Sequence, residues 1–433
     1  VLFAPPGLLL RLPEWAAPLG AAFGGGGGGI DARGLGNVRA AIDYGKRYGV
    51  CAVGAGLSGA VFAERYANVL NETVLVLDRR PHFGGNCYDY DDAITGVRMN
   101  KYGAHLFHTE SELAWRYVNM HAAAPAWVRW DHKVKGFIDG QLVPIPANIE
   151  TVNRLFGLHI KDEAEMRTWL EENQVPCPGP GGRCEDAEQM AKSRVGEALF
   201  EAIFRHYTRK QWAKEPRELD ALVTARIPVR GSFDERYFSD RYQALPSEGY
   251  TAWFAALLDH PNIDVALGVD YFEHRAHLDA ACGKVIYTGP IDRYFAGAGL
   301  EELEYRGIDF VVERHLGAGT VQPNSVVNYP GAEPGYTRVV EYKHFLDQDT
   351  RGSVTVKEFS KVMGPGDDPY YPVPNARNLA LYEAYRALAA EQEAAGRVHF
   401  VGRLANYKYF NMDATIVNAL EMFYNITGLP LEL

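Results

Sequence analysis

The sequence predicts an α/β protein, and three of its segments indicate how the parts are arranged. Residues 48–86 change from strand to helix and back to strand periodicity, which is typical of a βαβ unit. Residues 148–222 carry apolar side chains at helical spacing. Residues 321–342 and 352–359 alternate β-branched residues with turn residues, which favours an antiparallel sheet.

The βαβ unit contains the glycine pattern of a dinucleotide-binding turn, GAGLSG. Gly54 makes the tight turn, Gly56 lets the backbone approach a pyrophosphate, and Gly59 lets helix and strand pack closely. The helix start offers free N–H groups to phosphates. The second strand ends at Asp78, 22 residues after Gly56, where a carboxylate can accept hydrogen bonds from a ribose. We therefore expect a Rossmann-like domain.

The segment that follows bears on which dinucleotide is bound, because the glycine pattern alone leaves NAD and FAD open. Residues 78–86 read DRRPHFGGN, with two cations and the pair Gly84-Gly85 directly after the acid. This segment resembles flavoproteins of the glutathione-reductase-like superfamily, where Gly-Gly lets the backbone approach FAD. The resemblance favours FAD.

Two later segments are expected to join the same domain. Residues 284–290 read as an apolar strand that returns to the first sheet beside the flavin, as in two-domain flavoproteins. Residues 398–413 read as a strand ending at Gly402, a turn, and Asp413 at the start of an amphipathic helix. That helix start can face cofactor oxygens. Asp413 also suits an ordinary N-cap, and the two roles are compatible.

Composition limits the classes of partner. The 433-residue chain has a formal net charge of -11, so nucleic-acid binding has no electrostatic support. No apolar run reaches the roughly 18 residues of a membrane-spanning helix. Five cysteines, an odd number in a large chain, favour a reducing, cytoplasmic compartment over a disulfide framework. Cys177 and Cys184 could pair or bind metal, but a plain loop is the favoured interpretation.

Histidines and aromatic residues supply further candidates. His105 and His108 are spaced three apart, but Gly103 breaks a helix, so a loop histidine against a cofactor ring is favoured over a metal site. The stretch YTRKQW at 207–212 and the cations at 226–230 suit a nucleotide, with a ring to stack on a base and guanidinium groups to hold phosphate. A helix end with solvated charge explains them equally well.

The domain boundaries that we expect are as follows. Residues 1–45 form a low-complexity, flexible extension; residues 46–130, about 283–300 and 396–427 form the FAD-binding domain; residues 148–235 form an inserted helical substrate domain with a mobile loop; residues 131–147 and 236–374 form an antiparallel-sheet substrate domain; residues 375–395 form an exposed helix.

Nine motifs in order resemble UDP-galactopyranose mutases of the bacterial type. They are GAGLSG, DRRPHFGGN, GAHLFHT, DGQLVPIP, YTRKQW, TARIP, YTRVVEYKH, DPYYPVP and FVGRLANYKYFNMD, and they run from about residue 48 to the C-terminal region. The resemblance implies an FAD-binding Rossmann-like domain, an inserted helical domain and a twisted antiparallel sheet.

The resemblance also implies a chemistry. Such enzymes interconvert UDP-galactopyranose and UDP-galactofuranose with reduced FAD and no net oxidation. The flavin N5 attacks the anomeric carbon and displaces UDP, the adduct opens as an iminium, and the sugar recloses as a furanose. This is covalent catalysis by the cofactor, so the protein needs no side-chain nucleophile. NAD(P)H or another reductant acts transiently, and relatives are usually homodimers.

Site residues follow from the same resemblance, motif by motif. Arg226 and Arg338 are expected to hold the diphosphate, and His105 is expected to lie against the flavin near N5; these three are the expected catalytic residues. The expected substrate-binding residues are Tyr207, Trp212, Arg226, Tyr237, Asn328, Arg338, Tyr371, Tyr409 and Asn411. The expected cofactor-binding residues are Gly54, Ala55, Gly56, Ser58, Gly59, Asp78, Arg79, Gly84, Gly85, Asn86, His105, Gly402, Arg403, Met412, Asp413 and Thr415.

Two departures and two rival functions remain. Asn411 stands where many relatives have Asp, which puts acid–base chemistry there in doubt, and Ala213 stands where Gly is common. One rival is an amine-oxidase-like FAD-dependent oxidoreductase on the same fold. The other is an FAD-bound sensor or binding protein without catalysis.

Overall fold

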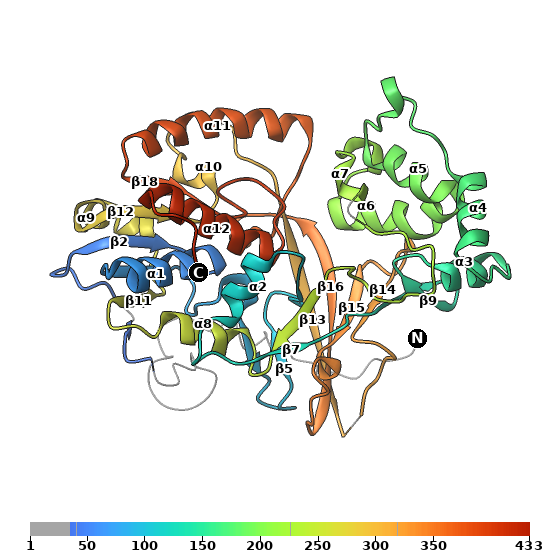
Figure 1. The fold of residues 1–433 in the computed structure, drawn as a ribbon, viewed down its shortest axis with the longest axis horizontal. Helices are drawn as coiled ribbons and strands as arrows, with labels where there is room; N and C mark the ends of the chain where they lie inside the picture. Colours follow the sequence, from blue (N-terminus) through green and yellow to red (C-terminus); the bar gives the residue numbers. More distant parts are fainter. Residues whose placement is uncertain (1–34, 40, 226, 318) are drawn as a thin grey trace, which may run out of the picture.

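The computed structural model describes residues 35–39, 41–225, 227–317 and 319–433 (Figure 1). The first 34 residues of the predicted extension, and the predicted diphosphate ligand Arg226, lie outside the described residues. The chain folds around two large sheets. In Figure 1 the first lies among α1, α9, α11 and α12, and the second separates these helices from a group formed by α3 to α7.

The first sheet is parallel and has the order β1-β11-β3-β2-β12-β18. Its strands are β1 (Val38–Arg39), β2 (Tyr48–Val53), β3 (Val74–Asp78), β11 (Ile263–Leu267), β12 (Cys282–Tyr287) and β18 (Val398–Phe400). The predicted βαβ unit and the predicted return of residues 284–290 to this sheet are confirmed. Two boundaries differ, because β1 lies within the predicted extension and β11 within the predicted antiparallel-sheet domain.

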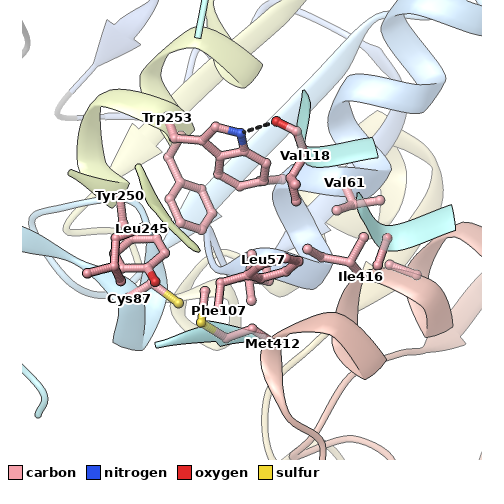
Figure 2. Packing of buried hydrophobic residues seen from close by; sticks show 14 of the residues in the cluster. Leu57, Val61, Cys87, Phe107, Val118, Leu245, Tyr250, Trp253, Met412 and Ile416 are labelled. Atoms are coloured by element: carbon pink, nitrogen blue, oxygen red, sulfur yellow. Dashed lines mark hydrogen bonds between the residues drawn. The ribbon is translucent and has the colours of Figure 1, made fainter. Parts of the chain in front are cut away.

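Helices cover both faces of the parallel sheet, as its apolar strands require. One face packs against α1 (Leu57–Leu70), α8 (Tyr250–Leu258) and α12 (Met412–Thr427). The other packs against α9 (Arg275–Ala281), α10 (Ile291–Tyr294) and α11 (Ala376–Ala394). Successive strand residues such as Leu75 and Val76 therefore enter different cores. Figure 2 shows the first core, where the Trp253 indole donates to the carbonyl oxygen of Val118 at 3.1 Å.

The second sheet has the order β17-β13-β16-β15-β14-β8-β9. Its strands are β8 (Val134–Ile138), β9 (Gln141–Ile145), β13 (Tyr305–Leu316), β14 (Val326–Asn328), β15 (Arg338–Glu341), β16 (Gly352–Val362) and β17 (Tyr371–Pro372). All neighbours are antiparallel except β14 and β8, so the predicted antiparallel sheet is confirmed with one parallel pair. The predicted hairpin at Asp139-Gly140 joins β8 to β9, an edge strand.

The helical group beyond the second sheet contains α3 (Ile149–Phe156), α4 (Glu163–Asn173), α5 (Ala187–Leu199), a π-helical turn at Phe200–Arg205, α6 (His206–Trp212) and α7 (Leu222–Ala225). The first three helices begin at Asn148, Asp162 and Asp186, whose side chains accept backbone N–H bonds as N-caps. The helical region between residues 148 and 222 that the apolar spacing predicted is therefore observed.

Smaller elements complete the fold between the two large sheets. They are β4 (Asp89–Asp91), β5 (Arg98–Asn100), β6 (Phe107–Thr109), α2 (Glu112–Asn119), β7 (Trp127–Arg129) and β10 (Tyr242–Pro246). Within the described part of the chain, the helices are all too short or too polar to cross a membrane.

The cysteines differ from the prediction. Cys51 on β2 and Cys282 on β12 form a disulfide between neighbouring strands, and Cys177 and Cys184 form a second one across the loop before α5. The interpretation of 177–184 as a plain loop was therefore wrong. The sequence-based argument failed because parity and chain length say nothing of which residues the sheet brings side by side. Cys87 is the free cysteine of the described residues, and it is buried.

Candidate active site

A cavity of about 590 Å³ opens where the strands of the parallel sheet end. Its walls include Gly54 and Thr288, which follow β2 and β12, and Asp78, the last residue of β3. The carboxyl ends of parallel strands are the usual ligand position in open α/β sheets. The volume is within the range of small-molecule and cofactor sites. The sheet topology thus places the predicted dinucleotide-binding motif at the edge of a cavity.

Glycines form the floor of this cavity because backbone approaches backbone there. A Cβ on Gly59 would lie 1.8 Å from the carbonyl oxygen of Gly54, and a Cβ on Gly85 would lie 2.7 Å from the Cα of Gly56. Gly56 is also the N-cap of the 14-residue helix α1, so its first N–H groups have no capping side chain. A helix start with free N–H groups and no Cβ in the way fits a pyrophosphate. The residues present therefore fit a dinucleotide cofactor.

Asp78 lines the cavity at the end of β3, and its carboxylate also organises the surrounding turns. One oxygen accepts a hydrogen bond from the amide of Ala55 at 3.0 Å, and the other accepts the amide of Arg80 at 2.9 Å. Arg80 in turn donates to the Asn86 side chain at 2.9 Å. Ala55 thus acts through its amide and does not itself line the cavity. The carboxylate that could meet a ribose is held rigidly by both motifs.

His105 lies on a loop at the inner end of the same cavity, as its prediction required. Its Nδ1 lies 2.8 Å from the carbonyl oxygen of Gly103, which assigns the proton to Nδ1, and its own carbonyl accepts from the Tyr250 hydroxyl at 3.0 Å. Burial, with the Arg403 and Arg338 cations, lowers the pKa of His105 to about 4. A neutral imidazole is therefore presented to the cavity at neutral pH.

The last wall comes from the segment between β18 and α12. Arg403, Met412 and Thr415 line the cavity, and Arg403 is held by the carbonyl oxygen of Phe410 at 2.8 Å. Gly402 lies behind them, because a Cβ there would meet the Ser58 hydroxyl at 2.5 Å. Asp413 points elsewhere: its carboxylate accepts from the Thr109 hydroxyl at 2.9 Å, so it joins α12 to β6.

Most of the expected cofactor-binding residues line one cavity. They are Gly54, Gly56, Ser58, Asp78, Arg79, Gly84, Gly85, Asn86, His105, Arg403, Met412 and Thr415. The four that do not are Ala55, Gly59, Gly402 and Asp413. The first three of these support the cavity wall from behind, and only Asp413 belongs to a different contact.

Arg338 begins β15 and is the described member of the predicted arginine pair. Its Nε donates to the carboxylate of Glu358 on β16 at 2.6 Å, and the Glu358 side chain is only 2 % exposed. Burial lowers the pKa of the Arg338 guanidinium, but the Glu358 carboxylate outweighs that effect and holds it well above the ordinary value. Arg338 is therefore a fixed cation with its remaining N–H groups available.

The sequence did not single out Glu358, although its role in the structure is clear. Its second carboxylate oxygen is buried and has no hydrogen-bond partner among the described residues. That oxygen faces the His105 loop, since a Cβ on Gly103 would lie 3.1 Å from it. The sequence shows only an acidic residue within a predicted strand. That Glu358 lies opposite Arg338 follows from the register of the sheet.

Several expected substrate residues lie around Arg338. Tyr371 stacks on Tyr409 with ring centroids 5.2 Å apart, and the Arg403 guanidinium lies 5.5 Å from the Tyr371 ring centre. Burial raises the pKa of the Tyr371 phenol to about 12, with Arg338 and Arg403 acting in the opposite sense. Both cations therefore lie near neutral phenols that can donate hydrogen bonds to an anion.

Tyr207 joins this group from α6. Burial raises the pKa of the Tyr207 phenol, while the nearby Arg338 acts to lower it; Tyr237, Glu358 and Tyr371 are further electrostatic neighbours that raise it. Tyr237 itself follows the isolated bridge from residue 133 to 236, and its amide donates to the carbonyl oxygen of His132 at 2.6 Å. The fold thus brings together residues that lie far apart in the sequence.

Trp212 was expected on a mobile loop, and the structure places it elsewhere. It is the last residue of α6 and is 4 % exposed, packed in a small core with Ala187, Leu219 and Val223. Its ring centroid lies 6.4 Å from that of Tyr371. Ala213 ends the helix in the left-handed conformation, with φ 53°. This explains why glycine suits the position after Trp212.

The two expected asparagines differ in their surroundings. Asn328 ends β14 opposite Arg338, and its buried Oδ1 has no partner among the residues that the structure describes. Asn411 is exposed and precedes α12, with its side chain making no cap hydrogen bond.

His108, the alternative metal candidate, pairs with Asp240 at 3.0 Å, and the described part of the chain contains no group of residues that could hold a metal ion.

Comparisons with known proteins point to one family. Residues 202–409 match the family described as UDP-galactopyranose mutase, and residues 53–120 match the NAD(P)-binding Rossmann-like domain. A Klebsiella pneumoniae protein named "Probable UDP-galactopyranose mutase" is 37% identical over 85% of this chain and 92% of its own. An Escherichia coli dTDP-fucopyranose mutase is 34% identical over 86% of this chain and 96% of its own.

Solved structures show the same fold. A crystal structure of reduced UDP-galactopyranose mutase superposes with a TM-score of 0.68 at 14% identity, covering 89% of this chain and 95% of that one. A putative protoporphyrinogen oxidase from Exiguobacterium superposes with a TM-score of 0.59 at 14% identity, covering 87% of this chain and 98% of that one.

Proposed function

Because the chain belongs to the UDP-galactopyranose mutase family, we propose that it interconverts UDP-galactopyranose and UDP-galactofuranose with FAD bound in the cavity of the parallel sheet. The observation that carries the proposal is the convergence of Arg338, Tyr207 and Tyr371 next to the His105 end of that cavity. A diphosphate needs a fixed cation and hydroxyl donors, and this group supplies both.

In this proposal, reduced flavin supplies the nucleophile for the anomeric carbon of the sugar, and the chain's residues do the rest. Arg338, fixed by Glu358, holds the diphosphate in place while its bond to the sugar is broken. Tyr371 and Tyr409 donate hydrogen bonds to phosphate oxygens, and Tyr207 stacks on the base. Arg226 is proposed as the second cation from its motif.

His105 is proposed to position the flavin within the cavity. Its neutral imidazole adds no positive charge beside the cofactor, and its Nδ1 proton is committed to the Gly103 carbonyl. Its Nε2 is therefore the atom that can accept a hydrogen bond. We propose a homodimer that NAD(P)H or another reductant activates transiently; the two disulfides remove the cysteine argument for a cytoplasmic location.

The test is direct. Purified protein should show oxidised-flavin absorbance that dithionite bleaches, and the reduced protein should convert UDP-galactofuranose to the pyranose without consuming stoichiometric reductant. Arg338→Lys should lose most turnover, because a lysine ammonium cannot replace a guanidinium that pairs with Glu358 and binds the phosphate at the same time. A colourless, fully active protein would refute the assignment of FAD.

A second substrate deserves an arm in the same assay, because one relative at 34% identity is a dTDP-fucopyranose mutase. The two substrates share the nucleoside diphosphate and differ in base and sugar. Measuring kcat/KM for UDP-galactofuranose and dTDP-fucofuranose on one preparation separates them. Stoichiometric consumption of oxygen with an amine and no mutase activity would instead favour the amine-oxidase-like oxidoreductase.

A further inference from the structure

Helix α6, which carries Tyr207 and Trp212, is attached to the second sheet by a lysine. Lys210 Nζ donates to the carbonyl oxygens of Tyr329, Pro334 and Tyr336, the last two at 3.0 Å. These carbonyls belong to the loop between β14 and β15, the segment that separates Asn328 from Arg338. One ammonium group thus fixes the helix to the loop between two expected substrate residues.

An arginine from the sheet attaches the same helix from the other side. Arg306 on β13 is 2 % exposed, and its Nε donates to the carbonyl oxygen of Gln211 at 2.8 Å, with Nη2 3.5 Å from that of Lys210. These carbonyls lie in the last turn of α6, where helix carbonyls lack internal partners and carry partial negative charge. Arg306 therefore supplies hydrogen-bond donors to free carbonyl oxygens at the end of α6, next to Trp212.

Neither cation forms an ion pair with a carboxylate in the described part of the chain, although both are substantially buried. Burial lowers the pKa of Lys210 to about 8, with Glu333 acting in the opposite direction, and burial lowers the pKa of Arg306 to about 10. Burying a charge without a counter-charge is costly. Lys210 on α6 bonds to the neighbouring loop and Arg306 on β13 bonds to α6, so two such cations hold this helix, which indicates that its position matters.

Both attachments lead to the site. Tyr207 lies one turn before Lys210 on α6, and Trp212 lies next to Gln211. Arg306 also pairs in register with Tyr371, and its carbonyl oxygen accepts the amide of Tyr370 at 2.9 Å. Moving α6 would therefore change the distance from Tyr207 to Arg338 and Tyr371.

We propose that Lys210 and Arg306 are positioning residues for the nucleotide, which hold α6 against the second sheet so that Tyr207 meets the base while Arg338 and Tyr371 hold the diphosphate. The inference rests on the proposed function. It assigns neither residue a contact with the substrate, since their side-chain hydrogen bonds to the described residues all go to backbone oxygens.

The experiment is a titration of UDP into the flavin-loaded protein by calorimetry. Lys210→Met removes the three bonds and should weaken UDP binding by about tenfold or more, because lost hydrogen bonds loosen Tyr207. The matched control is Arg209→Met on the same helix, whose guanidinium pairs with Glu215 at the surface at 2.8 Å; it should bind UDP within about twofold of wild type. Arg306→Lys, which keeps the charge, should weaken UDP binding by about threefold or more.

A double-mutant cycle distinguishes positioning from a general structural role. If Lys210 acts through Tyr207, then Lys210→Met introduced into Tyr207→Ala should weaken UDP binding by less than about twofold further. Flavin content and melting temperature show whether each variant is folded. If Lys210→Met does not fold, Arg306→Lys replaces it in the experiment. The inference would be overturned if Lys210→Met weakened UDP binding equally in the wild-type and Tyr207→Ala backgrounds. It would also be overturned if Lys210→Met and Arg306→Lys both bound UDP with wild-type affinity. Either result would leave the proposed function standing. A folded wild-type protein that binds no UDP would overturn the proposed function and the inference with it.

Discussion

Gly85→Ala tests the cofactor cavity most directly, because the structure shows why a single methyl group should be harmful there. Gly85 has φ +58°, and an added Cβ would lie 2.7 Å from the Cα of Gly56. Left-handed backbone costs alanine about 1–2 kcal/mol. Overpacking against another backbone costs about 1–3 kcal/mol.

Together these costs give roughly 2–5 kcal/mol against the arrangement in which the two glycine turns meet. The protein can avoid the clash by moving the turns apart, but that movement disrupts the cradle for the pyrophosphate. At about 1.4 kcal/mol for each factor of ten, FAD should bind at least about 30-fold more weakly. Reconstitution of the apoprotein, followed by flavin fluorescence, measures the dissociation constant.

The matched control is Gly157→Ala, at the end of α3. Gly157 has φ +63°, and an added Cβ there would meet nothing within 4 Å. It therefore imposes a similar backbone cost without the clash and far from the cavity, so stability should fall by about 1 kcal/mol while FAD affinity stays unchanged. If Gly85→Ala bound FAD as tightly as Gly157→Ala, the argument from the close approach of the two turns would be wrong.

Three further outcomes are expected. Ala213→Gly should stabilise the protein by up to about 1 kcal/mol, because φ 53° is strained for alanine, and thermal unfolding measures it. Burial lowers the pKa of His82 and of His132 to about 3 each. Between pH 6.5 and 3 the unfolded chain therefore binds more protons than the folded chain, and the free energy of unfolding decreases as the pH is lowered. Urea unfolding at pH 7 and 5.5 should show a loss of about 2 kcal/mol from the pair. Asp413→Asn should cost about 1 kcal/mol through the weakened Thr109 contact, with FAD affinity within about threefold of wild type.

Each of these has an outcome that contradicts it. An unchanged or lower melting temperature for Ala213→Gly would show that residue 213 is not strained in solution. For the histidines, the variant with both replaced by Gln should lose less stability on acidification, and an equal loss would assign the effect to other groups. A large loss of FAD from Asp413→Asn would mean that this carboxylate reaches the cofactor in the loaded protein.

The parts of the fold that could be predicted are those in which local chemistry and long-range structure agree. The GAGLSG turn, the acid at Asp78 and the alternating apolar runs gave the βαβ unit and the return of residues 284–290, because buried parallel strands read as continuous apolar runs. The short strand β1 could not be predicted, since two residues carry no period. β11 was not predicted as a strand; it lies within the range 236–374 expected for the antiparallel-sheet domain, because a strand of five residues does not reveal its neighbours.

The site divides in the same way. Residues inside recognisable motifs, such as Arg403, Met412 and Thr415, do line the cavity. Glu358 and Arg306 were missed because their importance depends on which backbone or side chain lies opposite them, and this depends on strand register and helix docking. Asp413 shows the converse: a carboxylate at a helix start looks like a ligand, whereas here it binds a neighbouring hydroxyl.

The order of strands in the parallel sheet has a consequence for how the molecule is made. Among the described strands, β18, at residues 398–400, pairs with β12 alone, and β12 pairs with β2 near residue 50; Thr415 completes the cavity wall. A ribosome must therefore have synthesised residues 50–415 before this cavity can form. Contacts over such long sequence separations form slowly, so a complete binding place for a dinucleotide requires the glycine turn and the segment 398–415 to be folded together.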